Sequence, residues 1–209
     1  QAAVELAQEF DAPLLIHVSE TADEVESWIN QTAMPPVRWL EAQGVLDTKV
    51  IAAHCVHTNR EEIRILKAHG VGVVHSPSSN LKLASGFAPV VDMLAAGVSL
   101  GLGTDGCASN NNLDMFEEMH LTALVQKAVS NSPVVASARE VMAMATIHGA
   151  KALHLDHQIG SLEKGKRADL AIVDGTRLHT VPHFDTTGLN IYSRLVYATK
   201  SADVRHVII

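Results

Sequence analysis

Hydrophobic and polar positions along the chain fall into two kinds of alternating segment. Short, nearly continuous apolar runs occupy residues 12–20, 49–57, 70–79 and 97–106. Each run predicts a strand that is covered on both faces. Segments with apolar residues at helical spacing, such as 113–129 and 137–153, lie between or after them. Four consecutive strand–helix units predict an α/β fold with a parallel sheet, either open or part of a closed barrel.

Start signals for helices follow several of these runs. In a capping box, a Ser or Thr hydroxyl and a Glu three residues later satisfy free N–H groups of the first helical turn. The pattern occurs at Thr21 with Glu24, Thr58 with Glu61 and Ser137 with Glu140. We therefore expect helices to begin at these three places.

The pattern changes after residue 157. Residues 159–174 predict two short strands joined at Lys164–Gly165. The remaining segments, 178–184 and 194–209, have β-type composition and no clear helical pattern. The end of the chain therefore predicts part of a small β-rich appendage.

Composition narrows the class of protein. With 209 residues and 47% hydrophobic residues, the chain is long and apolar enough for a globular core. Its net charge of −7 argues against nucleic acid or an anionic membrane as the main partner. No apolar run approaches the roughly 20 residues of a membrane span, and no signal or transit peptide is recognised. Two cysteines make no disulfide framework, so we expect a cytoplasmic protein.

Both ends of the chain look internal to a longer protein. Gln1 lies within a predicted amphipathic helix, and the chain stops in the strand-like run 204–209. We expect the chain to be one piece of that protein and any active site within it to be incomplete.

Polar side chains gather where the predicted strands end. His17, with Glu20 three residues later, follows the first strand, and His54, His75 and Asp105 follow the next three. In a parallel α/β sheet or barrel these carboxyl ends lie on one face, where ligands bind. Taken singly, each residue has an ordinary structural explanation. A hydrogen-bonded core histidine, an acid in the first helical turn or a simple turn would account for any one of them. The convergence of four strand ends nevertheless favours a ligand-binding site.

Imidazole nitrogen and carboxylate oxygen around one open position are typical of a catalytic zinc site. Such an ion generates hydroxide near neutral pH, and nearby carboxylates move protons. We expect His17 and Asp105 to be metal ligands, with additional His from outside this segment. We expect His17 to be largely buried, His57 to be structural or to face solvent, and Cys55 and Cys107 to be small buried residues.

The Asn run 110–112 could cap the following helix or contact substrate, and we expect it to cap the helix. The role of His75 stays open, because it could shape the loop, bind substrate or do neither.

The motifs LLIHVSET, AAHCVHT, VVHSPSSNLKLASG and LGTDGCASNNNLDMFEEM, followed by GSLEKGKRADLAIVD, together resemble the amidohydrolase superfamily. The resemblance covers essentially the whole chain. It implies that residues 1–157 form strands five to eight of a (β/α)8 TIM-type barrel and that 158–209 form part of a small β-sandwich domain. Within the superfamily, the chain is most similar to the deaminases of 5-methylthioadenosine and S-adenosylhomocysteine.

The resemblance also implies roles by position. His17 corresponds to a metal ligand, and Asp105 to a metal ligand and general base. Glu20 corresponds to the acid that contacts the substrate ring and relays a proton, and His54 to the side chain that polarises the attacking oxygen. The cofactor would be one divalent ion, zinc or alternatively iron or manganese. The family's H-x-H pair is absent from this chain.

The resulting hypothesis is a metal-dependent hydrolytic deaminase of purine nucleoside-like small molecules, with a possible homodimer and neither nucleic acid nor membrane as partner. Two kinds of alternative stay open. One is an amidohydrolase with another leaving group or ring, such as a triazine hydrolase or a guanine deaminase. The other is a barrel scaffold without catalysis, against which the four intact site residues argue.

Overall fold

A four-stranded parallel sheet organises the computed structural model, which describes residues 2–181 and 190–209. The strand order is the chain order. The strands are β1 Leu14–Val18, β2 Val50–His54, β3 Gly72–His75 and β4 Ser99–Leu102. All four lie inside the segments expected from the sequence, and the predicted α/β fold with a parallel sheet is confirmed.

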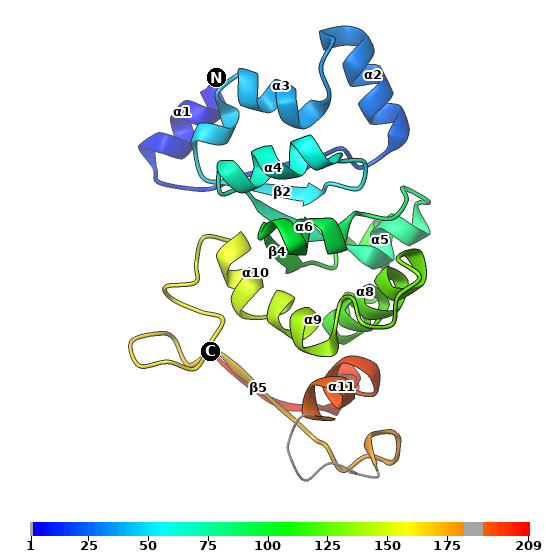
Figure 1. The fold of residues 1–209 in the computed structure, drawn as a ribbon. Coiled ribbons are helices and arrows are strands. Elements are labelled where there is room, and N and C mark those ends of the chain that lie inside the picture. The colour runs from blue at the N-terminus through cyan, green and yellow to red at the C-terminus, as the bar shows by residue number, and fades with distance from the viewer. Residues whose placement is uncertain (1, 182–189) are drawn as a thin grey trace.

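Helices precede and connect the strands. The elements of the first half are α1 Ala2–Glu9, α2 Ala22–Thr32, α3 Pro36–Ala42, the 3-10 helix η1 Val45–Asp47, α4 Arg60–Ala68, α5 Pro77–Lys82 and α6 Val90–Ala96. After β4 follow α7 Cys107–Asn110, α8 Met115–Val129, α9 Ala138–Met144 and α10 Ile147–Ala152. Figure 1 shows α4 and α6 packed on one side of the strands.

The main core lies between the sheet and these outer helices. Val50, Val73 and Leu100 of the strands pack with Leu66 of α4 and Met93 of α6, and all five are at most 1% exposed. Burial of such side chains stabilises the fold by about 1.5–3 kcal/mol each. This core holds β2, β3 and β4 in register and so fixes where their ends lie.

The three predicted capping boxes differ in how far the structure confirms them. The Ser137–Glu140 box is confirmed at the start of α9. The box expected at Thr58 lies one residue later, because Asn59 and Glu62 cap α4 while the Thr58 hydroxyl donates to the Cys55 carbonyl. Thr21 caps the Glu24 N–H, but the Glu24 carboxylate accepts from two other backbone groups described with the site.

The helix predicted over 137–153 is two helices. α9 ends at Met144 and α10 begins at Ile147, and between them Thr146 has φ −132° and ψ −105°. The Thr146 hydroxyl donates to the Met142 carbonyl at 2.7 Å, a side-chain bond that competes with the helical ladder. The chain thereby changes direction and brings α10 onto β3 and β4.

The end of the chain departs most from expectation. Only β5 Leu170–Val173 forms in the segment that predicts two strands, and it pairs antiparallel with β6 Val204–Ile208. Lys164–Gly165 does form a turn, but the residues before it lie outside the described strands, with Leu162 73% exposed. A segment without a neighbouring strand has no ladder of hydrogen bonds to join.

A helix also forms where none was expected. α11 Asn190–Tyr197 lies between the 3-10 helices η2 Leu178–Thr180 and η3 Ser201–Asp203. Its β-type residues are helical because the helix packs against α8 and α9, where Val196 is fully buried. Tertiary packing here overrides local propensity. The part of the expected β-type run at 182–184 lies outside the described residues.

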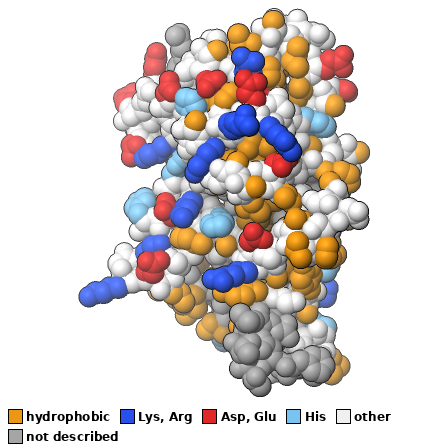
Figure 2. All heavy atoms as spheres, in the orientation of Figure 1, with side chains coloured by type: hydrophobic (Ala, Val, Ile, Leu, Met, Phe, Trp, Pro, Cys, Tyr) orange, Lys and Arg blue, Asp and Glu red, His pale blue; other side chains and the backbone are white. Residues whose placement is uncertain are grey.

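The surface carries charges of both signs. Figure 2 shows Lys and Arg mixed with Asp and Glu on the face of α4 and α6. Among the described residues, no helix has the length and hydrophobicity needed to cross a bilayer.

Candidate active site

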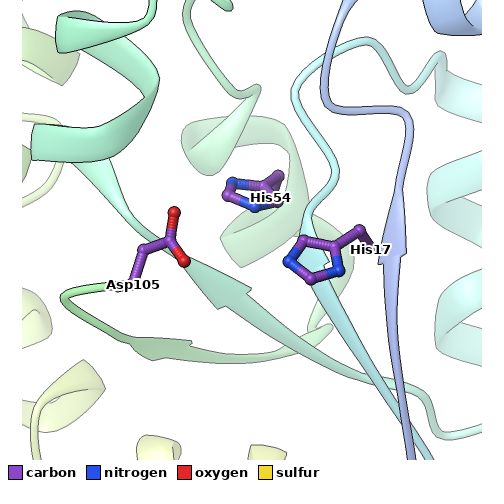
Figure 3. Close-up of side chains that lie close together, drawn as sticks. All are labelled: His17, His54 and Asp105. Atoms are coloured by element: carbon purple, nitrogen blue, oxygen red, sulfur yellow. The ribbon is translucent and has the colours of Figure 1, made fainter. Parts of the chain in front are cut away.

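Three predicted site residues converge at the carboxyl end of the parallel sheet. His17 lies in β1, His54 ends β2, and Asp105 follows β4 by three residues. Each offers one nitrogen or oxygen atom, and these three atoms lie within 4.8 Å of one another. Figure 3 shows the side chains pointing toward a common point from three segments of the chain. One divalent ion can bridge donors at such separations.

Backbone geometry turns His54 toward this point. In the register of β1 and β2, His17 is paired with Ala53, and both line the pocket at the strand ends. Consecutive strand residues alternate between faces, yet His54 lines the same pocket. Its φ of 70° departs from strand geometry and redirects the side chain. The His17 and His54 rings consequently stack, with centroids 5.2 Å apart and planes 24° apart.

His54 is held on both sides. Its Nδ1 lies 2.9 Å from Oδ1 of Asn80 in α5, and its Nε2 lies 3.8 Å from Oε2 of Glu20. The His54 side chain is only 2% exposed. The ring therefore has a fixed orientation, with one nitrogen in the protein and the other toward the pocket and Glu20.

Asp105 is oriented by two hydroxyls. Ser79 and Ser109 each donate to its Oδ2 at 2.7 Å. Desolvation raises the pKa of the carboxyl, but the hydrogen bonds from Ser109, Ser79 and the Gly106 N–H, with the nearby His54, outweigh it and lower the pKa to about 2. Asp105 is thus a carboxylate at neutral pH, as a metal ligand must be.

Glu20 reaches the site from the loop after β1. Its Oε1 accepts a 3.4 Å hydrogen bond from Ser85, and its backbone N–H donates to Oε2 of Glu24 at 2.7 Å. Glu24 also accepts from the Ser19 N–H at 2.9 Å, so one carboxylate clamps the loop. A half-buried acid beside the donor cluster is suited to exchanging protons with a bound molecule.

His75 does not join the cluster. It is 3% exposed, and within the described part of the chain both ring nitrogens lack a hydrogen-bond partner. Burial, with a smaller contribution from His54, lowers its pKa to about 4. His75 is therefore a neutral core residue near neutral pH.

Two burial predictions are wrong. His17 is exposed, because β1 is the edge of the described sheet and its side with Leu15 borders the open pocket. Cys107 is exposed because it begins α7 on the surface loop after Asp105. Cys55 is fully buried as expected, and burial raises the pKa of its thiol. His57 is structural, with Nε2 2.7 Å from the Ser85 carbonyl oxygen.

The Asn run does not cap α8; the Asp114 side chain accepts from Phe116 and Glu117 N–H instead. Asn110 is the last residue of α7, and its side chain connects α7 to α8. Its Nδ2 donates to both the Thr104 carbonyl and the Glu118 carboxylate. The residues that support the site, Ser79, Asn80, Ser109 and Glu118, were not predicted individually. The dense polar stretch after β3 was the one sequence signal for the first two.

The pocket itself is mostly apolar. Its volume is about 440 Å³, which lies within the range of small-molecule binding sites. Its walls include Leu15, Ile51, Ala53 and Val74, while His17, His54 and Asp105 stand at one end. An apolar wall with a few convergent polar groups fits a largely uncharged organic ligand.

The carboxyl end of the parallel sheet thus carries two histidines and an aspartate, a donor set that a divalent metal ion can accept. The amidohydrolase family model matches residues 1–209, and the chain belongs to this family. Among curated proteins, it is 48% identical over 206 residues to a 5-methylthioadenosine/S-adenosylhomocysteine deaminase of Thermoanaerobacter pseudethanolicus. The match covers 99% of this chain and 47% of that relative.

Solved structures show the same fold. An adenosine deaminase from Xanthomonas campestris with bound zinc superposes with a TM-score of 0.92 and 41% identity, covering 98% of this chain and 46% of that one. An atrazine chlorohydrolase from Arthrobacter aurescens in complex with zinc gives a TM-score of 0.87 and 30% identity, covering 99% and 44%. The chain spans about half the length of the curated relatives it matches.

Proposed function

We propose that this chain supplies part of the active site of a metal-dependent hydrolytic deaminase. Its substrates would be purine nucleoside-like molecules of the methylthioadenosine and S-adenosylhomocysteine class, and ammonia would be released. The observation that carries the proposal is the convergence of His17, His54 and Asp105 donor atoms within 4.8 Å, next to Glu20. The 48% identity to a deaminase of this class supports the choice of substrate.

In this proposal β1 to β4 are strands five to eight of a (β/α)8 barrel. Residues 158–209 belong to a small β-sandwich domain. The parallel order of the four strands and the antiparallel pair of β5 and β6 support this assignment. Active sites of such barrels lie at the carboxyl ends of the strands, where the candidate site lies.

The donor set fits zinc, with iron or manganese as alternatives. His17 and Asp105 would hold the ion, because each offers a donor atom at the common point. The hydrogen bonds that lower the pKa of Asp105 keep it in the ligand form. Two ligands are fewer than a catalytic zinc site uses, so we propose that residues outside this chain complete it. When bound, the ion makes hydroxide available near neutral pH.

The side chains of this chain would then carry out the proton transfers. A water oxygen forms a bond to the ring carbon that carries the amino group, and the carbon–nitrogen bond breaks. Asp105 accepts the water's proton and passes it to the departing amine, which leaves as ammonia. Glu20 protonates the neighbouring ring nitrogen, contacts the substrate there, and takes up the second proton of the attacking water as the product forms. His54 accepts a hydrogen bond at Nε2 from the attacking water and so orients its oxygen toward the ring carbon. The net reaction consumes one water and releases one ammonia.

The direct test is ammonia release by a protein of the relatives' length that contains this chain. Methylthioadenosine, S-adenosylhomocysteine, adenosine, guanine and a chlorotriazine serve as substrates, and metal content is measured in parallel. We expect stoichiometric divalent metal and the highest kcat/KM with the first two. Preference for guanine or chloride release from the triazine would replace the proposed substrate. Absence of both metal and turnover would favour a scaffold.

Glu20→Gln isolates the proton relay. We expect kcat to fall by at least about 100-fold, because a positioned acid–base group contributes that much, while metal content stays unchanged. Glu26→Gln, an exposed acid of α2, is the matched control and should leave kcat unaltered. Near wild-type activity of Glu20→Gln would remove Glu20 from the mechanism.

A further inference from the structure

Helix α5 carries two consecutive buried residues that contact different members of the site. Ser79 is fully buried and donates to Asp105, while Asn80 is 1% exposed and its Oδ1 lies 2.9 Å from His54 Nδ1. One short helix therefore contacts both the acid from the β4 loop and the imidazole of β2 from the protein side.

The contact with Asn80 determines the protonation of the His54 ring. An amide oxygen only accepts hydrogen bonds, so the imidazole Nδ1 must carry a proton to bind it. In a neutral imidazole the other nitrogen then has a free lone pair. His54 Nε2, which lies 3.8 Å from Glu20 Oε2 on the pocket side, is that nitrogen.

We propose that Asn80 is a positioning residue that locks His54 in the Nδ1-protonated tautomer, with Nε2 presented to the reacting atoms. The inference rests on the proposed function for its catalytic consequence, while the tautomer itself is a property of the folded chain. Asn80 acts through His54 and does not itself reach substrate.

Burial makes this contact specific. Within the described residues the Asn80 Nδ2 has no hydrogen-bond partner, so the bond to His54 is the polar contact that orients the amide. Burying an amide with one of its groups unpaired has a desolvation cost. A leucine of similar size would avoid that cost, and the gain from keeping Asn is the orientation of His54.

The helix that carries Asn80 is itself fixed. Glu118 of α8 is fully buried, and its carboxylate accepts from the Ser78 N–H at 3.1 Å and from Asn110 Nδ2 at 2.7 Å. Asn110 Nδ2 also donates to the Thr104 carbonyl at 2.8 Å, one residue before Asp105. One buried carboxylate thus ties α5 to the loop of Asp105, so Asn80 has little freedom to release His54.

Two substitutions at this position separate orientation from packing. Asn80→Leu removes the acceptor and keeps the volume, and we expect kcat to fall about 10- to 100-fold with KM close to wild type and metal retained. Asn80→Asp keeps an acceptor oxygen and should recover most of that loss. Asn30→Leu, on the exposed side of α2, controls for the exchange of Asn for Leu and should change neither constant.

The tautomer is measured directly on the wild-type protein of full length. Nitrogen-15 labelling of histidine and long-range proton–nitrogen correlation spectra distinguish protonation at Nδ1 from Nε2, and a His54→Gln sample assigns the signals. We expect Nδ1 to carry the proton in metal-free and metal-loaded protein, and Asn80→Leu to shift the ring toward the other tautomer.

The outcomes test the proposed role of Asn80 separately from the proposed deaminase function. Protonation at Nε2 in the wild type overturns the role of Asn80, as does wild-type kcat in Asn80→Leu or a loss in Asn80→Asp as large as in Asn80→Leu. If Asn80→Leu does not fold, the spectrum of the wild type still decides. If no purine nucleoside releases ammonia while His54 is protonated at Nδ1, the proposed function fails and the positioning by Asn80 stands.

Discussion

At the scale of single residues, four residues in or next to the site have unusual backbone angles. Ser19, His54, Cys55 and Asp105 all have positive φ without being glycine, at 52°, 70°, 48° and 60°. Such conformations cost about 1–3 kcal/mol each and persist where surrounding contacts hold them. Here those contacts include the clamp by Glu24 on Ser19 and the hydroxyls on Asp105. Local strain is therefore part of how the donors are brought together.

His75 predicts a specific pH dependence of stability. Its pKa is about 4 in the folded state against an ordinary value of 6.5, so the unfolded chain takes up a proton between these values and the folded state does not. The contribution of His75 is fully present above pH 6.5 and is lost as pH falls toward 4, by roughly 3 kcal/mol.

Denaturant unfolding at pH 7 and pH 4.5 tests this contribution. His75→Leu cannot take up the proton, so its free energy of unfolding should fall less with pH than that of the wild type. His157→Gln, an exposed histidine, should behave as the wild type does. Equal losses in His75→Leu and wild type would show that His75 titrates normally in the fold.

The site residues His17, His54 and Asp105 could be predicted from sequence because strand ends can be located from apolar runs. His17, His54 and Asp105 follow such runs, and parallel topology brings their ends together. Asn80 and Glu118 were not accessible, because nothing in the spacing shows that residues 26 and 13 positions away from His54 and Asp105 share a hydrogen-bond network. That information is in the tertiary contacts of α5 and α8.

At the scale of elements, two glycines allow α10 to approach the sheet closely. A Cβ at Gly72 of β3 would lie 1.8 Å from the Ala152 carbonyl oxygen, and one at Gly101 of β4 would lie 2.9 Å from the Cα of Gly149. Backbone atoms cannot move aside as a flexible side chain can. The close packing of α10 on β3 and β4 therefore depends on the missing side chains.

Gly72→Ala should lower the free energy of unfolding by about 3 kcal/mol or more, since overpacking against backbone forces the elements apart. Gly106→Ala is the matched control, because a Cβ there meets nothing within 4 Å and the φ of −78° suits alanine. Chemical denaturation of the two variants measures the difference. Similar stabilities would show that α10 can shift away without cost.

Elements with a strong periodic pattern were predictable, and those set by packing were not. The four parallel strands and the long helix α8 match the apolar patterns. The break at Thr146 includes a local bond to Met142 and places α10 against β4, and α11 packs on α8 and α9, so both features accompany contacts with elements far away in the sequence. A local pattern carries no information about such partners.

At the scale of the whole molecule, one side of the sheet has an open apolar wall. Leu15 is 66% exposed and borders the pocket with Ile51, Ala53 and Val74. Apolar surface of this kind is normally covered. If residues outside this chain complete the metal site, as proposed, the same residues would also cover this apolar wall.

Residues 1–209 on their own should bind a hydrophobic dye at this wall. Leu15→Lys is expected to lower the fluorescence of the bound dye, because it places a charge within the apolar surface. Leu178→Lys changes an even more exposed leucine, 92% exposed, in η2 away from the pocket and should have little effect. An equal decrease in both would place the dye elsewhere.

The pairing of β1 with β2 limits which insertions and deletions the protein can accept. His17 is opposite Ala53, and Val18 is opposite His54. One residue inserted within β1 ahead of His17 would turn the imidazole to the other side of the sheet. Two residues would restore the side but move the ring by roughly 7 Å along the strand. Insertions and deletions can therefore accumulate in the surface loops of this lineage, whereas the strands that carry the donors must keep their length.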